Sequence, residues 1–304
     1  MKTPKIKITK AQANFAKQFL LKEDDFDPTV GLKELIIAGG KDNLELAEAI
    51  ADGHKIDLFP IIEETWGDML DLQGYRYSTH SIDILQKINS LSVDKKTVYI
   101  PSIIRNMQNL ERILLTNCKV MEISDEISNL QKLESFGILY GTVEVFPSAI
   151  CNSKSLESIF ISNTNNTITE IPSKIGNLQN LKYLSLSFLG ISDLPESVGN
   201  LKKLRNLGIT GNRLQYVPNC IQYLTNLKVL NLHSNNLSEL PDFIGNLTSI
   251  VSLTVSYNLL EEIPKVIYNL PNLQEVLISG NNIPKEELKK FKQYCKKRGI
   301  YIEA

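Results

Sequence analysis

A pattern of apolar and polar positions recurs every 23 residues through most of this chain, between residues 97 and 283. The clearest copy is Leu204-x-x-Leu207-x-Ile209-x-x-Asn212-x-Leu214. Its alternation of apolar and polar residues predicts a half-buried strand, with the leucines pointing into a coil. Successive strands of this kind pair in parallel and form one continuous sheet. The first apolar position of the eight copies falls at Leu110, Leu133, Leu156, Leu181, Leu204, Leu227, Ile250 and Leu273.

The repeat is regular apart from one insertion and one degenerate copy. The spacing is 23 residues except between Leu156 and Leu181, where it is 25 and the polar run 163–167 contains the additional residues. A degenerate copy begins at Ile88, 22 residues before Leu110, and predicts an initial strand. We therefore assign residues 86–284 to eight repeats preceded by one degenerate unit.

A proline lies nine residues before the start of seven of the eight copies, and Ser124 is the exception. Because proline lacks an N–H and fixes φ, it does not fit a central strand or a helix interior. The prolines therefore predict the outer side of each coil, built from extended chain or short 3-10 turns. They are Pro101, Pro147, Pro172, Pro195, Pro218, Pro241 and Pro264.

Asparagine occupies the ninth position of the last four copies. Its side chain can satisfy backbone groups that lose their partners where the chain turns. Stacked coils of this kind bury one core that no single unit could bury alone. In the first four copies Cys118, Gly141, Thr164 and Leu189 replace the asparagine, so we expect that half to curve irregularly.

The segment Leu-Pro-x-x-Ile-Gly-Asn-Leu-x-x-Leu, followed by Leu-x-x-Leu-x-Leu-x-x-Asn-x-Leu, resembles the 23-residue leucine-rich repeats of many bacterial proteins and of intracellular eukaryotic scaffolds. The resemblance covers about two thirds of the chain. It implies an α/β solenoid in the form of a right-handed horseshoe, with a parallel concave sheet and an irregular or 3-10 convex side. It also implies that the protein binds other proteins.

The two ends of an open solenoid expose apolar faces and need caps. Residues 285–298 predict a helix that begins after Pro284 and ends at Gly299, with a short strand over 300–302. Residues 285–304 therefore form the expected C-terminal cap. Residues 1–85 lack the repeat and alternate helix-like stretches with breakers, which predicts a mainly helical N-terminal region that caps the other end.

Composition narrows the classes of partner and location. The chain has 33 basic and 34 acidic side chains, so its charge does not favour nucleic acid. No apolar run approaches the ~18 residues that cross a membrane, and the N-terminus lacks the apolar stretch of a signal peptide. The four cysteines are far apart in the sequence, which favours free thiols in a reducing compartment. We therefore expect a cytoplasmic protein and, from the resemblance, a bacterial one.

The residues that carry chemistry do not indicate an enzyme. The three histidines fall in different segments, and no cysteine or histidine cluster has metal-ligand spacing. Motifs for a phosphate loop, a dinucleotide site or a nucleophile elbow are missing from the sequence. We expect no catalysis, no metal and no small-molecule cofactor.

The repeat also predicts which side chains point outward along the concave face, because positions three, five and seven alternate with the buried ones. Clustered aromatic and aliphatic side chains on such a face commonly mark interfaces. His233 beside Tyr257 adds a polar contact at the far end. The predicted partner-binding residues are Arg112, Leu114, Leu139, Tyr140, Phe160, Tyr183, Phe188, His233 and Tyr257. Two alternatives stay open: Phe160 and Leu114 cover each other, or the N-terminal region folds over them.

These observations predict a non-catalytic module that binds a protein or peptide on its concave face. One alternative is an enzyme or toxin-like effector whose activity lies in residues 1–85. Another is an adaptor for a small GTPase-like switch, which rests on analogy with scaffolds that use the same repeat.

Overall fold

The computed structural model describes residues 88–304 except 96, 101–103, 106 and 164, together with Leu32 and Ala47. Both of these N-terminal residues are helical and completely buried. The rest of the predicted N-terminal cap, and the alternatives that depend on it, lie outside the described residues.

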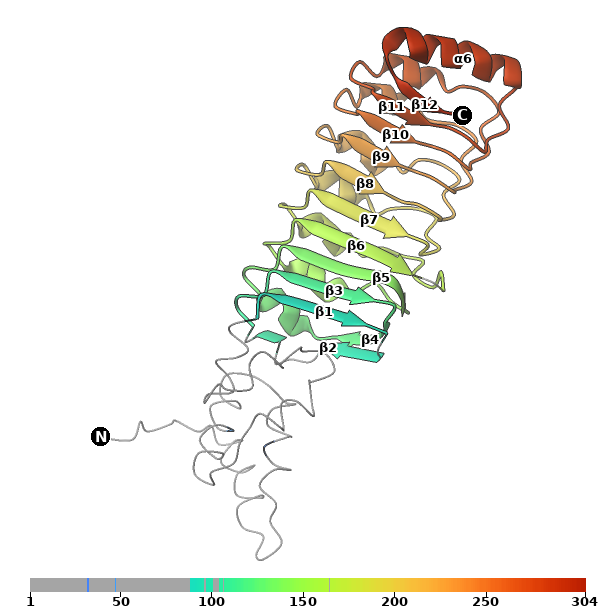
Figure 1. Ribbon diagram of the computed structural model, residues 1–304. Coiled ribbons are helices and arrows are strands. Elements are labelled where there is room, and N and C mark those ends of the chain that lie inside the picture. Colours follow the sequence, from blue (N-terminus) through green and yellow to red (C-terminus); the bar gives the residue numbers. More distant parts are fainter. Residues whose placement is uncertain are drawn as a thin grey trace, which may run out of the picture.

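One long parallel sheet forms the concave side of a solenoid, and its strands follow one another in chain order (Figure 1). Each strand pairs with the next at an offset of one repeat, so that Leu184 lies opposite Leu207 and Leu207 opposite Leu230. The predicted degenerate unit supplies the first strand. The strands are β1 (Ser90–Asp94), β3 (Arg112–Thr116), β5 (Ser135–Val143), β6 (Ser158–Asn163), β7 (Tyr183–Ser187), β8 (Asn206–Gly208), β9 (Val229–Asn231), β10 (Ser252–Thr254), β11 (Glu275–Leu277) and β12 (Tyr301–Glu303).

The convex side consists of short 3-10 helices, as the prolines predicted. A proline is the N-cap residue of six of them and fixes the φ angle with which the chain enters the turn. Ser124 is the N-cap of η3, and its hydroxyl accepts a hydrogen bond from the Glu126 N–H at 3.3 Å. The helices are η3 (Asp125–Asn129), η4 (Ser148–Asn152), η5 (Ser173–Asn177), η6 (Glu196–Asn200), η7 (Asn219–Tyr223), η8 (Asp242–Asn246) and η9 (Lys265–Asn269).

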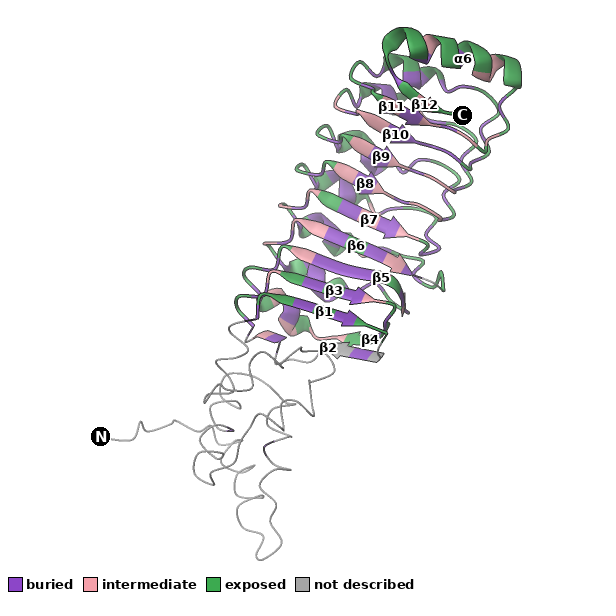
Figure 2. Cartoon of the chain, viewed as in Figure 1, coloured by how far each residue is buried: buried purple, intermediate pink, exposed green. Residues whose placement is uncertain are grey.

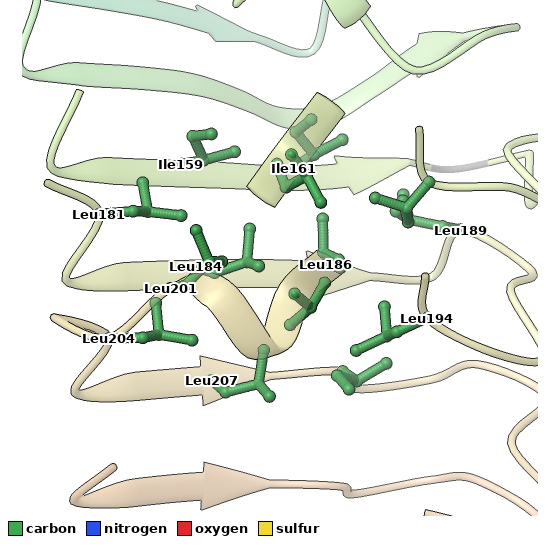
Figure 3. Close-up of a cluster of buried hydrophobic side chains, with 14 of the residues drawn as sticks. Ile159, Ile161, Leu181, Leu184, Leu186, Leu189, Leu194, Leu201, Leu204 and Leu207 are labelled. Atoms are coloured by element: carbon green, nitrogen blue, oxygen red, sulfur yellow. The ribbon is translucent and has the colours of Figure 1, made fainter. Parts of the chain in front are cut away.

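The core lies between the sheet and the 3-10 helices and runs the length of the solenoid. Figure 2 shows buried and accessible residues alternating along the strands, as period-two patterning requires. In Figure 3 the leucines of neighbouring coils stack in files, for example Leu181 above Leu204 and Leu184 above Leu207. All four of these leucines are at most 1% exposed. Each coil therefore completes the apolar environment of the coil before it.

The asparagines at the ninth position of the later copies bond backbone groups at the turns, as predicted. The Asn212 Oδ1 accepts hydrogen bonds from the backbone N–H groups of residues 189–191 at 3.0–3.3 Å. Its Nδ2 donates to the carbonyls of Leu186 and Thr210, at 2.8 and 3.0 Å. One buried amide thus satisfies five backbone groups at the turn. Asn235, Asn258 and Asn281 make the corresponding bonds to the coil before each of them.

The first coils satisfy the same backbone groups with a second parallel sheet, which the sequence did not predict. After the concave strand the chain continues into β2 (Thr97–Ile100), β4 (Lys119–Ile123) and the last residues of β5. Thr97 pairs with Lys119, and Lys119 pairs with Thr142. Backbone groups here bond to the next backbone, so an asparagine is not needed at Cys118 or Gly141. The Cys118 thiol still donates weakly to the Val93 carbonyl at 3.5 Å.

Gly141 and Asn163 show how this second sheet begins and ends. A Cβ at Gly141 would lie 2.6 Å from the Cys118 carbonyl oxygen, so only glycine permits the close approach of the two coils there. Asn163 is 1% exposed, and its side chain bonds both the N–H and the carbonyl of Val143, the last residue of β5. The asparagine function in the third copy therefore lies at its eighth residue and not at Thr164, the ninth.

The C-terminal cap agrees with the prediction. Helix α6 (Lys285–Arg298) follows Pro284 and ends at Gly299, which has a φ of 68°. Phe291 and Cys295 are buried against the last coil, while Leu288 and Tyr294 are partly buried there. Strand β12 then pairs with β11 and closes the concave sheet. Among the described helices, α6 included, none is long and apolar enough to cross a membrane.

Candidate binding surface

The predicted site residues lie in four lines that cross the strands of the concave face. Leu114 and Phe160 share the line of position five, where Gly137 lies between them and Ser185 follows. Tyr183 lies in the line of position three, opposite Ser158. Leu114, Phe160 and Tyr183 are 37–38% exposed, so the structure leaves about a third of each side chain accessible. These three side chains, with the partly buried Leu139, are called the concave patch below.

Leu114 and Phe160 are separated by a glycine rather than by another side chain. A Cβ at Gly137 would lie 2.9 Å from the Leu114 Cδ1, which means that Leu114 leans over Gly137 toward Phe160. This covering is partial, because both apolar side chains keep their exposed fraction. Leu114 and Phe160 therefore both stay partly accessible, whatever cover they give each other.

The rest of the concave face is almost uncharged. Of the 24 side chains at positions three, five and seven of the eight repeats, only Arg112 and Glu275 carry a charge. The Glu275 carboxylate accepts a hydrogen bond from the Ser252 hydroxyl at 2.6 Å. Serine, threonine, asparagine and glycine fill most of the other positions. Isolated aromatic side chains among small polar ones make a surface typical of protein-binding paratopes.

Two of the polar positions expected to point outward are buried. Thr254 is 8% exposed and Ser256 is 3% exposed, and the Ser256 hydroxyl accepts a hydrogen bond from the Ser279 hydroxyl at 3.3 Å. The accessible surface of β10 is correspondingly smaller than the alternation alone predicts.

The eighth position of each copy has a left-handed backbone conformation, which the sequence analysis missed. It has φ of 54–68° in every copy except the third, where Asn166 in the insertion takes this conformation with a φ of 52°. Glycine and asparagine are the residues that fit such a turn. Gly211, Gly280 and Asn117 follow this rule, and their recurrence at one position was the available signal.

Three copies instead place a large aromatic residue in this conformation: Tyr140, Phe188 and Tyr257. They are 64%, 47% and 59% exposed, and we call them the aromatic ridge. A bulky residue held in the left-handed region costs about 1 to 3 kcal/mol, so each of these positions is strained. Such strain concentrates at functional positions in proteins.

Neighbouring coils hold two of the ridge side chains in place. The Phe188 ring covers Gly211, where a Cβ would lie 2.3 Å from the Phe188 Cδ1. Tyr257 similarly covers Gly280, with 2.8 Å between such a Cβ and its Cδ1. His233 contacts Tyr257 edge-on, with ring centroids 5.0 Å apart. The predicted pair of His233 and Tyr257 is therefore present, three strands beyond Phe188.

The described part of the chain offers little catalytic chemistry. No group of three histidine, cysteine or acidic side chains within it could hold a metal ion. All four cysteines are free and buried, and burial raises the pKa of the Cys151 and Cys220 thiols from 9.0 to about 12. Thiols that stay protonated in this way are poor nucleophiles.

A pocket of about 400 Å³ lies beside the second sheet, at the point where the chain leaves β5. Its lining includes Met121, Val145 and Phe146 together with Glu122 and Glu144. It belongs to the outer side of the coil, apart from the concave patch and the aromatic ridge.

Comparison with known proteins agrees with this architecture. The family "Leucine-rich repeat region" matches residues 149–235, and the family "Leucine rich repeat" matches residues 225–283. A leucine-rich repeat protein of Leptospira interrogans covers 73% of this chain, and 74% of its own chain is covered, at 24% identity and a TM-score of 0.41. A search of curated protein sequences gives no match.

Two plant receptors in complex with peptides are also similar in structure. The Arabidopsis receptor kinase HAESA, in complex with the peptide hormone IDA and the co-receptor SERK1, is 26% identical over 63% of this chain, with a TM-score of 0.52. The plant peptide hormone receptor RGFR1, in complex with RGF2, is 26% identical over 70% of this chain, with a TM-score of 0.50. The match spans only 33% and 38% of those receptor chains.

Proposed function

Because the chain is a leucine-rich repeat protein, we propose that it binds a protein or peptide through the concave patch and is not itself an enzyme. Leucine-rich repeat domains are typically binding modules and usually non-catalytic, and the two plant receptors above are in complex with peptide hormones. The observation that carries the proposal is the exposure of Leu114, Phe160 and Tyr183 on a sheet face that is otherwise mostly polar and carries few charges.

The energetics of such a face favour a macromolecular partner. Aromatic side chains in the centre of an interface commonly contribute most of the binding free energy, while small polar residues around them adapt their hydrogen bonds. Phe160 and Tyr183 lie on adjacent strands of a rigid sheet, so little conformational freedom is lost when a partner covers them. The scarcity of charge means that binding should change little between low and physiological salt.

The test is recovery of partners from native lysate by the wild-type chain and by the double variant Phe160→Glu/Tyr183→Glu. A partner that docked on the patch would have to bury both new carboxylates, which is costly. The glutamates should not disturb the core, since both side chains already contact solvent. Val145→Glu/Tyr223→Glu is the matched control, because Val145 and Tyr223 are exposed apolar residues outside the concave face.

We expect a partner that the wild-type chain and the control variant recover and the patch variant does not. Circular dichroism and thermal melting would first establish that all three proteins are folded. Equal recovery by the patch variant, or loss with the control variant alone, would overturn the assignment of the concave patch.

A further inference from the structure

A row of charged residues lies along the edge of the solenoid where the concave strands begin (Figure 1). Each of these residues comes immediately before a strand, and the six strands from β3 to β9 are consecutive in the sheet. The equivalent residues on either side of the row, Asn89 and Val251, are uncharged. In chain order the row is Glu111, Glu134, Glu157, Lys182, Arg205 and Lys228, and we call it the charge ladder.

Backbone hydrogen bonds hold the ladder residues side by side. The N–H of each ladder residue after the first donates to the carbonyl of the ladder residue before it, at 2.7–2.9 Å. Neighbouring strands of a sheet are ~4.8 Å apart, so the ladder is about 24 Å long. Three negative charges therefore occupy one half of this edge and three positive charges the other half.

This order of charges does not stabilise the fold. Like charges on neighbouring strands repel each other, whereas alternating signs would attract. Opposite signs meet only at the centre of the ladder, where the Lys182 Nζ lies 2.6 Å from the Glu157 Oε1. Among the residues that the structure describes, the other four ladder residues form no ion pair. Glu134, Arg205 and Lys228 are exposed, so their charges are open to a partner.

The ladder is complementary to a reversed copy of itself. In an antiparallel arrangement each glutamate of one ladder lies opposite a cation of the other, with Glu134 opposite Arg205 and Glu111 opposite Lys228. A parallel arrangement would instead bring like charges together. A two-fold axis that runs from the concave to the convex side produces the antiparallel arrangement, and the contact is then the same on both copies. Such an axis leaves both concave faces on the same side of the dimer.

Four further lysines lie beside the ladder and change the balance of charge without removing its polarity. Lys132 and Lys154 lie beside the glutamates, and Lys202 and Lys203 lie beside the cations. Three glutamates and two lysines leave one net negative charge on the first half, while the second half has five positive charges. An anionic partner of another kind would match only the second half, whereas a second copy of the chain matches both.

We infer that two copies of this chain associate through their charge ladders in an antiparallel, two-fold symmetric dimer. The contact is a narrow strip of mostly solvent-accessible charges, so the association should be weak and sensitive to salt. The concave patch lies outside the strip and stays accessible in both copies. This inference is independent of the proposed function, which depends on other residues.

Sedimentation velocity of the wild-type chain at about 0.1 M and about 1 M salt measures the association, since the Debye length falls from ~10 to ~3 Å between these conditions. The Kd of the dimer should rise at least tenfold at the higher salt concentration. Arg205→Glu and Glu134→Arg each place like charges opposite each other at two symmetric points of the contact. Each single variant should therefore be monomeric. An equimolar mixture of the two variants restores both ion pairs and should form dimers as the wild type does.

The control variants are Arg213→Glu and Glu239→Arg, which reverse exposed charges on the opposite edge of the solenoid, beyond the ends of the concave strands. Each should dimerise like the wild type, and thermal melting should show that all four variants are folded. A wild-type chain that is monomeric at about 0.1 M salt would overturn the inference. So would single ladder variants that still dimerise, or a mixture of them that stays monomeric.

Discussion

The first coils and the later coils of this solenoid solve the same hydrogen-bonding problem in different ways. In the later coils one buried asparagine side chain bonds the turn of the preceding coil, as Asn212 does with four backbone groups of that coil and one of its own. In the first coils the backbone of β2, β4 and β5 bonds itself, and Cys118 and Gly141 occupy the asparagine position. The comparison teaches that this position requires satisfied backbone groups and not a particular side chain.

The largest expected difference between the two regions is the response to losing the ninth side chain. Asn212→Ala removes the side-chain partner of five backbone groups, of which the Thr210 carbonyl still accepts from the Phe188 N–H, and should cost about 3 kcal/mol or more. Cys118→Ala removes only a weak thiol donor and a small volume and should cost about 1 kcal/mol. Guanidinium denaturation of both variants, with hydrogen exchange to locate the loss, measures the difference. Equal costs would contradict the two-mechanism account.

The junction between the regions should be nearly as sensitive. Gly190 has a φ of 97°, and a Cβ there would lie 2.6 Å from the Asn166 carbonyl oxygen in the insertion. Gly190→Ala should therefore cost about 2 kcal/mol or more, from backbone strain and a clash together. Gly299→Ala is the control, since Gly299 also has a positive φ but has nothing within 4 Å of the added Cβ. Equal losses of thermal stability in the two variants would show that the close contact between residue 190 and Asn166 does not add to the cost.

Stability at alkaline pH tests whether the cysteines of the convex 3-10 helices are equally buried in both regions. Cys151 in η4 and Cys220 in η7 have folded-state pKa values of about 12, raised from 9.0 chiefly by burial. Because the folded pKa exceeds the unfolded one, the stabilisation is complete below pH 9 and is lost as pH rises toward 12. At pH 10 the titration of each thiol should lower the free energy of unfolding by about 1.4 kcal/mol.

The measurement is the free energy of unfolding at pH 8 and pH 10 for the wild type, Cys151→Ala and Cys220→Ala. Each single variant should show a smaller decline than the wild type, by a similar amount. A decline unaffected by either substitution would mean that other groups, such as lysines, account for the alkaline destabilisation.

The smallest expected effect concerns η3, which among the described 3-10 helices is the one capped by serine. The Ser124 N–H donates to the Ile100 carbonyl at 2.8 Å, so the second sheet extends to the position where other copies have proline. Ser124→Pro should therefore destabilise the chain by about 1 kcal/mol, although proline is the usual residue at this place in the repeat. Ser124→Ala keeps the N–H and loses only the side-chain cap, and should cost about 0.5 kcal/mol or slightly more. Thermal stability of the proline variant at or above that of the wild type would refute this explanation.

Much of this architecture could be predicted from the sequence because the repeat is expressed in local patterns. Period-two alternation located the concave strands, the prolines located the convex turns, and Pro284 and Gly299 bounded the last helix. The outward side of Leu114, Phe160 and Tyr183 followed from the same alternation.

The remaining features depend on contacts between coils, which no single copy of the repeat records. The second sheet forms because β4 pairs with both β2 and β5, and nothing in residues 119–123 distinguishes that strand from extended chain. Asn163 replaces the ninth-position asparagine because the insertion that follows shifts the turn by one residue. The left-handed backbone of Phe188 and the contact of its ring with Gly211 in the next coil both become visible only in the folded chain.

The claim that the concave patch binds the partner is tested most directly by site-specific photo-crosslinking in cells. The photoreactive residue p-benzoylphenylalanine would replace Phe160 in one variant and Tyr223, on the convex side, in another. The account predicts a discrete crosslinked product from position 160 and none from position 223. A product from position 223 alone would contradict it and assign the binding surface to the convex side.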